Sequence, residues 1–122
     1  MKKILIIDEF TFSTICSAIL ELEGHKTKIF KSAECMLPSN GNKFSLVITS
    51  YPYGHSFFEE LLRINLPTII MTDHINADVM HLLKTLPNAY CMIKPIDYDK
   101  FKALVRGIMN YGIPNTSEFQ IL

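Results

Sequence analysis

The chain has 122 residues, a hydrophobic fraction of 48% and a formal net charge of zero. This length accommodates one domain with a real core, and the balanced charge argues against a disordered tail or a basic nucleic-acid binder. No run of about 18 apolar residues is long enough to cross a membrane, and Asp8-Glu9 interrupts the first apolar run too early for a signal peptide. We expect a cytoplasmic protein that binds neither nucleic acid nor membrane.

Five short apolar runs recur at roughly 20-residue intervals. They are mostly continuous, which is typical of strands buried on both faces of a parallel sheet that helices cover. The run within Lys26–Phe30 alternates instead and predicts an edge strand. The fold class expected is therefore α/β, with a doubly wound five-stranded parallel sheet. The runs are Ile4–Ile7, Ile29–Phe30, Leu46–Ile48, Thr68–Met71 and Tyr90–Ile93.

Between the runs, apolar residues recur at helical spacing. The first helix is expected to bury Phe12, Ile15, Ile19 and Leu22 and to stop at Gly24. Three more apolar faces are Phe57, Phe58, Leu61 and Leu62; Ile75, Val79, Leu82 and Leu83, ended by Pro87; and Phe101, Leu104, Val105 and Ile108, opened by Asp97 as N-cap.

The remaining segments are less regular. Residues 32–42 allow at most a short helix, because Pro38 and a Ser-Asn-Gly-Asn run end it early. We expect one domain over residues 1–110 and a C-terminal tail over 111–122, partly ordered through Ile113, Phe119, Ile121 and Leu122. Three cysteines, Cys16, Cys35 and Cys91, lack the paired spacing of a disulfide framework or zinc site, so buried reduced thiols are expected.

Polar residues follow the strands at their carboxyl ends, which right-handed crossovers bring to one edge of the sheet. Asp8 and Glu9 are oxygen ligands suited to magnesium, or they complement the dipole of the next helix. Thr72 donates to an anion or caps the next helix, and Lys94 pairs with an anion or is solvated. No glycine follows Asp8-Glu9, which argues against a nucleotide-binding turn.

Taken together, these strand ends resemble the receiver domain of two-component response regulators. The resemblance covers residues 2 to about 110, through Lys3-Ile-Leu-Ile-Ile-Asp-Glu9, Leu66-Pro-Thr-Ile-Ile-Met-Thr72 and Lys94-Pro95. It implies the strand order 2-1-3-4-5, acids that hold magnesium, and a strand-three aspartate that takes a phosphoryl group from a histidine kinase. By position, Asp8 and Glu9 match the acids, Thr72 the phosphate-contacting hydroxyl and Lys94 the pairing lysine. A cis bond at Lys94-Pro95 is also implied.

The third strand departs from this pattern. Ser50 occupies the phosphoacceptor position, and no carboxylate lies between Ser45 and His55. Serine cannot form an acyl phosphate or complete a magnesium shell, so at most weak magnesium binding is expected at Asp8 and Glu9, and no other cofactor. The position of the family's switch aromatic falls on Cys91, beside Tyr90, and Asp73 adds a charge next to Thr72.

The first hypothesis is an atypical receiver, a signalling module of a bacterial two-component-type pathway that is independent of phosphorylation and is not an enzyme. The second is a phospho-receiver with another acceptor, such as Asp73, Asp8 or Glu9. The third is a flavodoxin-like or hydrolase-like enzyme that uses Ser50 with His55 or His74, although no Gly-x-Ser-x-Gly elbow is present.

The expected partners are proteins, among them a histidine kinase or another signalling protein. A homodimer through the face of the fourth helix, fifth strand and fifth helix is a further expectation from the resemblance. That region carries a modest basic bias from His81, Lys84, Lys100, Lys102 and Arg106.

Overall fold

The computed structural model describes residues 3–30, 44–53, 57–86, 88–111 and 120–121. The expected short helix in 32–42, and also Cys35, His55, Pro87, Ile113, Phe119 and Leu122, lie outside the described residues. In chain order the elements are β1 (Lys3–Ile7), α1 (Phe10–Leu22), β2 (Thr27–Ile29), β3 (Phe44–Ser50), α2 (Phe58–Ile64), β4 (Thr68–Thr72), α3 (Ala77–Thr85), β5 (Ala89–Ile93), α4 (Tyr98–Tyr111) and β6 (Gln120–Ile121).

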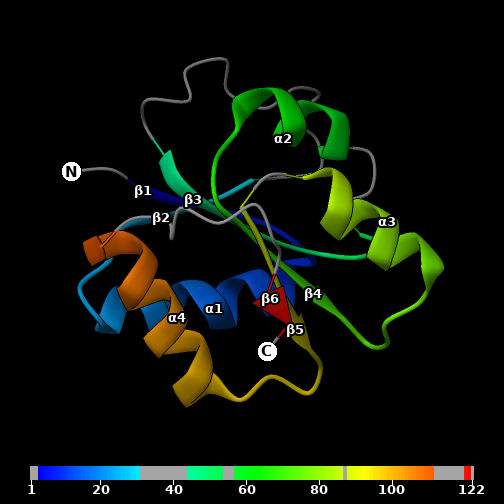
Figure 1. Ribbon diagram of the computed structural model, residues 1–122. Helices are drawn as coiled ribbons and strands as arrows, with labels where there is room; N and C mark the ends of the chain where they lie inside the picture. Colours follow the sequence, from blue (N-terminus) through cyan, green and yellow to red (C-terminus); the bar gives the residue numbers. More distant parts are fainter. Residues whose placement is uncertain (1–2, 31–43, 54–56, 87, 112–119, 122) are drawn as a thin grey trace.

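The strands form one parallel sheet in the order β2-β1-β3-β4-β5-β6 (Figure 1). This confirms the expected order 2-1-3-4-5 and the edge position of β2. The sequence did not predict β6, which pairs with β5 through Gln120 and Ile121. Two residues are too few to carry a periodic signal, so this strand is visible only once the tail is seen beside β5.

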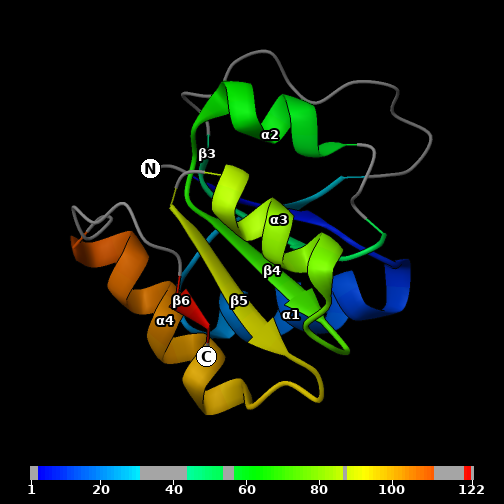
Figure 2. The same cartoon turned by 45° about the vertical axis from the view of Figure 1, so that its right-hand side comes forward.

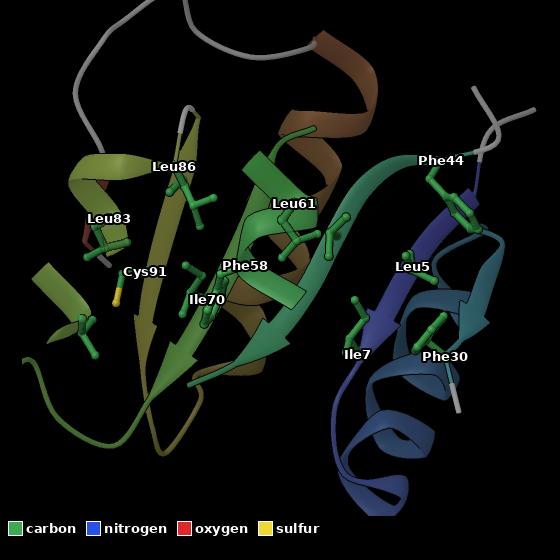
Figure 3. Close-up of a cluster of buried hydrophobic side chains, with 13 residues drawn as sticks. Leu5, Ile7, Phe30, Phe44, Phe58, Leu61, Ile70, Leu83, Leu86 and Cys91 are labelled. Atoms are coloured by element: carbon green, nitrogen blue, oxygen red, sulfur yellow. The ribbon is translucent and has the colours of Figure 1, made fainter. Parts of the chain in front are cut away.

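Helices cover both faces of the sheet, with α1 and α4 on one side and α2 and α3 on the other (Figures 1 and 2). Two groups of buried side chains fill the space. The α2–α3 core contains Leu5, Ile7, Ile70, Phe58 and Leu83 among others (Figure 3). The α1–α4 core contains residues such as Ile4, Ile6, Cys16, Leu20, Phe101 and Val105. None of the described helices is long and apolar enough to span a membrane.

Local signals set the helix ends. The N–H of His25 donates to the Leu20 carbonyl and that of Gly24 to the Glu21 carbonyl, with Gly24 at φ +91°, so a glycine-terminated Schellman motif ends α1. Asp97 accepts from the N–H groups of Asp99 and Lys100, which confirms it as the N-cap of α4.

The buried side of α1 differs in part from the expected one, since Phe12 packs against the α1–α4 core and Ile19 is half-buried. Ser13, Cys16 and Leu20 face the core, whereas Ile15 is 43% exposed and Leu22 is 88% exposed. Both sets have helical spacing, so the hydrophobic pattern alone allows either side. The sheet packs against the side with the small residues Ser13 and Cys16, and this leaves an apolar stripe on the outer face of α1.

Candidate functional site

The carboxyl ends of β1, β3, β4 and β5 meet at one edge of the sheet. Strand register pairs Ile7 with Thr49 and Ser50 with Met71. At the next junction, Thr72 pairs with Ile93, and the N–H of Lys94 donates to the Thr72 carbonyl over 2.8 Å. The expected residues therefore lie at the same edge, as the parallel sheet requires.

Asp8 and Ser50 are directly bonded and both are 3% exposed. The Ser50 hydroxyl donates to Oδ2 of Asp8, and the N–H of Glu9 donates to Oδ1 over 2.8 Å. A buried carboxylate without donors would carry a large desolvation cost. Each oxygen of Asp8 has a donor from the chain itself, so this acid is satisfied without a cation.

Glu9 differs from its neighbour because it is exposed and lies at the N-cap position of α1. Its side chain makes no capping hydrogen bond. The two adjacent acids are therefore in different environments, one buried and bonded, the other in solvent near a helix N-terminus, where a negative charge is favourable.

Lys94 lies half-buried at the end of β5, with its ammonium 4.8 Å from the centroid of the Phe12 ring. This is a cation–π distance. No carboxylate of the described residues lies within 4 Å of this ammonium. The Lys94-Pro95 bond is cis, as the resemblance implies, and Tyr51-Pro52 is cis as well.

Thr72 is 4% exposed and its hydroxyl donates to the carbonyl of His74 over 2.9 Å. The expectation that Thr72 could cap the next helix is wrong. Asn76 caps α3, because its side-chain oxygen accepts from the N–H of Val79 and its backbone is extended. Thr72 instead stabilises the loop between β4 and α3.

Cys91 and Tyr90, at and beside the position that the resemblance assigns to a switch aromatic, face opposite sides of the sheet. Cys91 lies in the α2–α3 core and Tyr90 in the α1–α4 core. Cys16 and Cys91 are both free, buried thiols, as expected for them. Burial raises the pKa of both Tyr90 and Cys91. No aromatic side chain thus stands at position 91, and the adjacent tyrosine is fixed in the other core.

Three α1 residues near the site were not singled out for it from the sequence. Phe12 is the ring beneath Lys94. Cys16 is fully buried, and burial, followed by the negative charge of Asp8, raises its pKa to about 12, while Lys94 acts in the opposite direction. The hydroxyl of Ser13 is buried and has no hydrogen-bond partner among the described residues. The only sequence signal for Ser13 and Cys16 was their helical spacing on a second side of α1.

The loop after Ser50 is tied to two helices. The Tyr51 ring stacks on Phe58 of α2 with centroids 6.4 Å apart, and its hydroxyl donates to Asp78 of α3 over 3.4 Å. Burial and the neighbouring Asp78 carboxylate raise the pKa of Tyr51. Pro52 and Tyr53 are exposed. Tyr51 thus holds the end of β3 against the layer formed by α2 and α3.

The described residues do not fit the magnesium site that the resemblance to receiver domains implies. Both oxygens of Asp8 already accept hydrogen bonds, Glu9 is exposed, and the Ser50 side chain beside Asp8 is a hydroxyl rather than a carboxylate. Within the described ranges, no three His, Cys, Asp or Glu side chains are grouped so that they could hold a metal ion.

Solved structures of other proteins share this fold. No protein-family model and no curated protein matches the sequence. Among solved structures, a two-component response regulator from Clostridium difficile matches with a TM-score of 0.74 and 20% identity, covering 91% of this chain and 98% of that one.

The non-phosphorylated HemR receiver domain from Leptospira biflexa matches with a TM-score of 0.74 and 18% identity, over 95% of this chain and 100% of that one. A CheY-like response regulator receiver domain protein from Methanospirillum hungatei matches at 0.67 and 19%, over 92% and 96%. These matches cover nearly the whole length of each chain, and the strand order is the same as expected. The chain therefore has the fold of a response-regulator receiver domain.

Proposed function

We propose that this domain is a pseudo-receiver, a signalling module of a two-component-type pathway that acts through protein contacts without phosphorylation at position 50. The buried hydrogen bond from Ser50 to Asp8 carries the proposal. Serine has no carboxylate from which an acyl phosphate could form, and its hydroxyl engages the acid that would otherwise be available to a cation. The partner class that this implies is a signalling protein, with a histidine kinase as one candidate.

The strand-end pocket consists of Asp8, Ser50, Thr72 and Lys94, and the last two support the same conclusion. The Lys94 ammonium lies over Phe12, and the Thr72 hydroxyl donates within its own loop. In a working receiver these two groups would contact the phosphoryl oxygens. Here each has a partner in the resting fold, so binding a phosphoryl group would first cost the loss of these contacts.

A phospho-receiver with another acceptor remains the second candidate. Asp73 follows Thr72 directly and is exposed, so a phosphoryl donor can reach it, unlike the buried Asp8. The enzyme hypothesis has less support. It assigns a histidine as the base, whereas the Ser50 hydroxyl donates to the Asp8 carboxylate, and Ser50 is only 3% exposed to a substrate.

The test is to add beryllofluoride with magnesium, or acetyl phosphate with magnesium, to the full chain and to follow backbone amide shifts by NMR. For the wild type we expect no saturable shifts at Asp8, Ser50, Thr72 or Lys94. For Ser50→Asp, we expect saturable shifts at these positions, because a third carboxylate restores the magnesium shell and the acceptor. Asn110→Asp adds the same charge on α4 and should leave the wild-type result unchanged.

Saturable shifts of the wild-type pocket would overturn the pseudo-receiver proposal. Shifts centred on Asp73, together with a hydroxylamine-sensitive modification after acetyl phosphate, would establish the second candidate instead. If Ser50→Asp stays silent while the variant remains folded, residue 50 is not what closes the pocket.

A further inference from the structure

The two edges of the sheet are protected in different ways. At the β2 edge, Lys26 and Lys28 are exposed, and the Glu21 carboxylate accepts from both the N–H and the hydroxyl of Thr27 over 3.1 Å. Charged side chains at an edge strand discourage pairing with another strand, and a side chain that occupies a backbone donor removes a pairing site. The β2 edge is therefore closed by charge.

The β5 edge has no such protection of its own. Its sequence, Ala-Tyr-Cys-Met-Ile, contains no charged residue, glycine or proline, and its first four residues are buried. On the side away from β4, the only described segment beside β5 is β6 (Figure 2), which pairs in parallel with Tyr90 and Cys91. Among the described residues, nothing pairs with Met92 and Ile93 on that side, and Ile93 is 41% exposed.

The described contact on this edge is short, because the described part of β6 pairs with Tyr90 and Cys91 alone. A pairing of two residues supplies one or two backbone hydrogen bonds, each worth about 0.5–1.5 kcal/mol net. A longer strand that pairs along all of Ala89–Ile93 would make more of them.

We propose that the β5 edge is a strand-acceptor surface for an uncharged, extended segment of a protein partner, and that β6 occupies it as a displaceable internal competitor. The direction of the partner strand is parallel to β5, as β6 is. The chemistry follows from the uncharged edge and from the uncharged sequence Phe-Gln-Ile-Leu at residues 119–122, which includes the resident strand. This surface lies between α3 and α4. While β6 is bound, it therefore stands between two copies that would dimerise through the face of α3, β5 and α4.

The test uses a fluorescent peptide with the sequence of residues 116–122, in which Glu118→Gln keeps the side chains uncharged, as probe and fluorescence anisotropy as readout. The release variant is the full chain with Gln120→Pro and Ile121→Pro, which removes both backbone N–H groups of β6 whichever one faces β5. A tethered strand competes at millimolar effective concentration, so the peptide should bind the release variant about tenfold tighter than the wild type. The same peptide carrying both prolines is the matched control and should not bind.

A second variant locates the site. Ile93→Lys, added to the release variant, places a charge at the exposed end of β5 and should weaken peptide binding while the NMR spectrum stays that of a folded domain. Equal peptide affinity for wild type and release variant would overturn the proposal. The test uses neither phosphoryl donor nor metal, so its outcome is separate from that of the pocket.

Discussion

The acid side and the lysine side of the pocket are built differently. Asp8 is buried and accepts from Ser50 and from the N–H of Glu9, whereas Lys94 is half-buried and lies over the Phe12 ring. In the resemblance that the sequence suggests, acid and lysine serve the same phosphoryl group. Here each has its own neutral partner, so the two sides can be perturbed separately. Loss of the contacts of the buried Asp8 should therefore lower the free energy of unfolding more than loss of the contact of the half-buried Lys94.

The largest effect is expected from Ser50→Asp in the absence of divalent ions. It places a second carboxylate in hydrogen-bonding distance of Asp8 in a buried site, and like charges there oppose ionisation. We expect the free energy of unfolding at pH 7 to fall by about 3 kcal/mol, equivalent to a pKa rise of about two units. Urea unfolding with EDTA measures the loss, and added magnesium should recover part of it.

Ser50→Asn is the matched control, since it adds a similar volume without charge and should cost less. A carboxylate whose pKa is higher in the folded than in the unfolded state stabilises the fold less as pH rises. The loss of unfolding free energy in Ser50→Asp should therefore be smaller at pH 4 than at pH 7. A variant as stable as the wild type without magnesium would mean that residue 50 and Asp8 are not in contact.

The second effect comes from Ser50→Ala, which removes the hydroxyl donor from a buried carboxylate. Hydrogen bonds to charged groups are worth about 1.5–3 kcal/mol, so a loss of about 2 kcal/mol is expected in urea unfolding. A double-mutant cycle with Asp8→Asn isolates the pair, because the serine should matter less once its acceptor is neutral. Additive losses would show that the hydroxyl stabilises β3 without acting through Asp8.

The third effect is on the lysine side and should be smaller. Lys94→Met keeps most of the apolar stem and removes the charge over Phe12, at a cost of about 0.5–1 kcal/mol. Phe12→Leu should make Lys94→Met nearly neutral, and the cycle of both variants gives the coupling from thermal unfolding. A coupling as large as that of Ser50 with Asp8 would remove the contrast between the two sides.

The strand ends were predictable from the sequence, whereas their partners were not. Strands buried on both faces leave continuous apolar runs, and the residues after them must lie at one edge, which placed Asp8, Ser50, Thr72 and Lys94. The bond from Ser50 to Asp8 and the stacking of Lys94 on Phe12 depend on side-chain placement across elements, which no local pattern encodes.

The prediction of which side of α1 is buried failed in part, for a different reason. The helix carries apolar residues on two sides, and the periodic signal does not say which one meets the sheet. The fully buried residues Ser13 and Cys16 are small, so the sheet can pack closely against their side of the helix. Close packing therefore determines which side of α1 is buried, whereas the apolar pattern alone does not. The two-residue strand β6 was below the length at which a strand has a pattern at all.

The smallest effect is expected at an exposed ion pair that serves as a reference for the pocket. Arg106 of α4 donates to the Glu23 carboxylate at 2.7 Å, and this hydrogen bond lowers the pKa of Glu23. A lowered folded pKa stabilises the fold above the ordinary carboxylate pKa of about 4.3 and loses this contribution as pH falls through the folded value. Arg106→Gln should therefore reduce the urea midpoint slightly at pH 7 and still less at pH 3. Lys84→Gln removes an exposed cation of α3 that has no ion pair among the described residues, so its effect should lack this pH dependence. If Arg106→Gln lowers the urea midpoint as much as Ser50→Ala at pH 7, a solvent-exposed pair is as strong as the buried one. Burial would then not explain why the Asp8 side of the pocket is more sensitive to substitution than the Lys94 side.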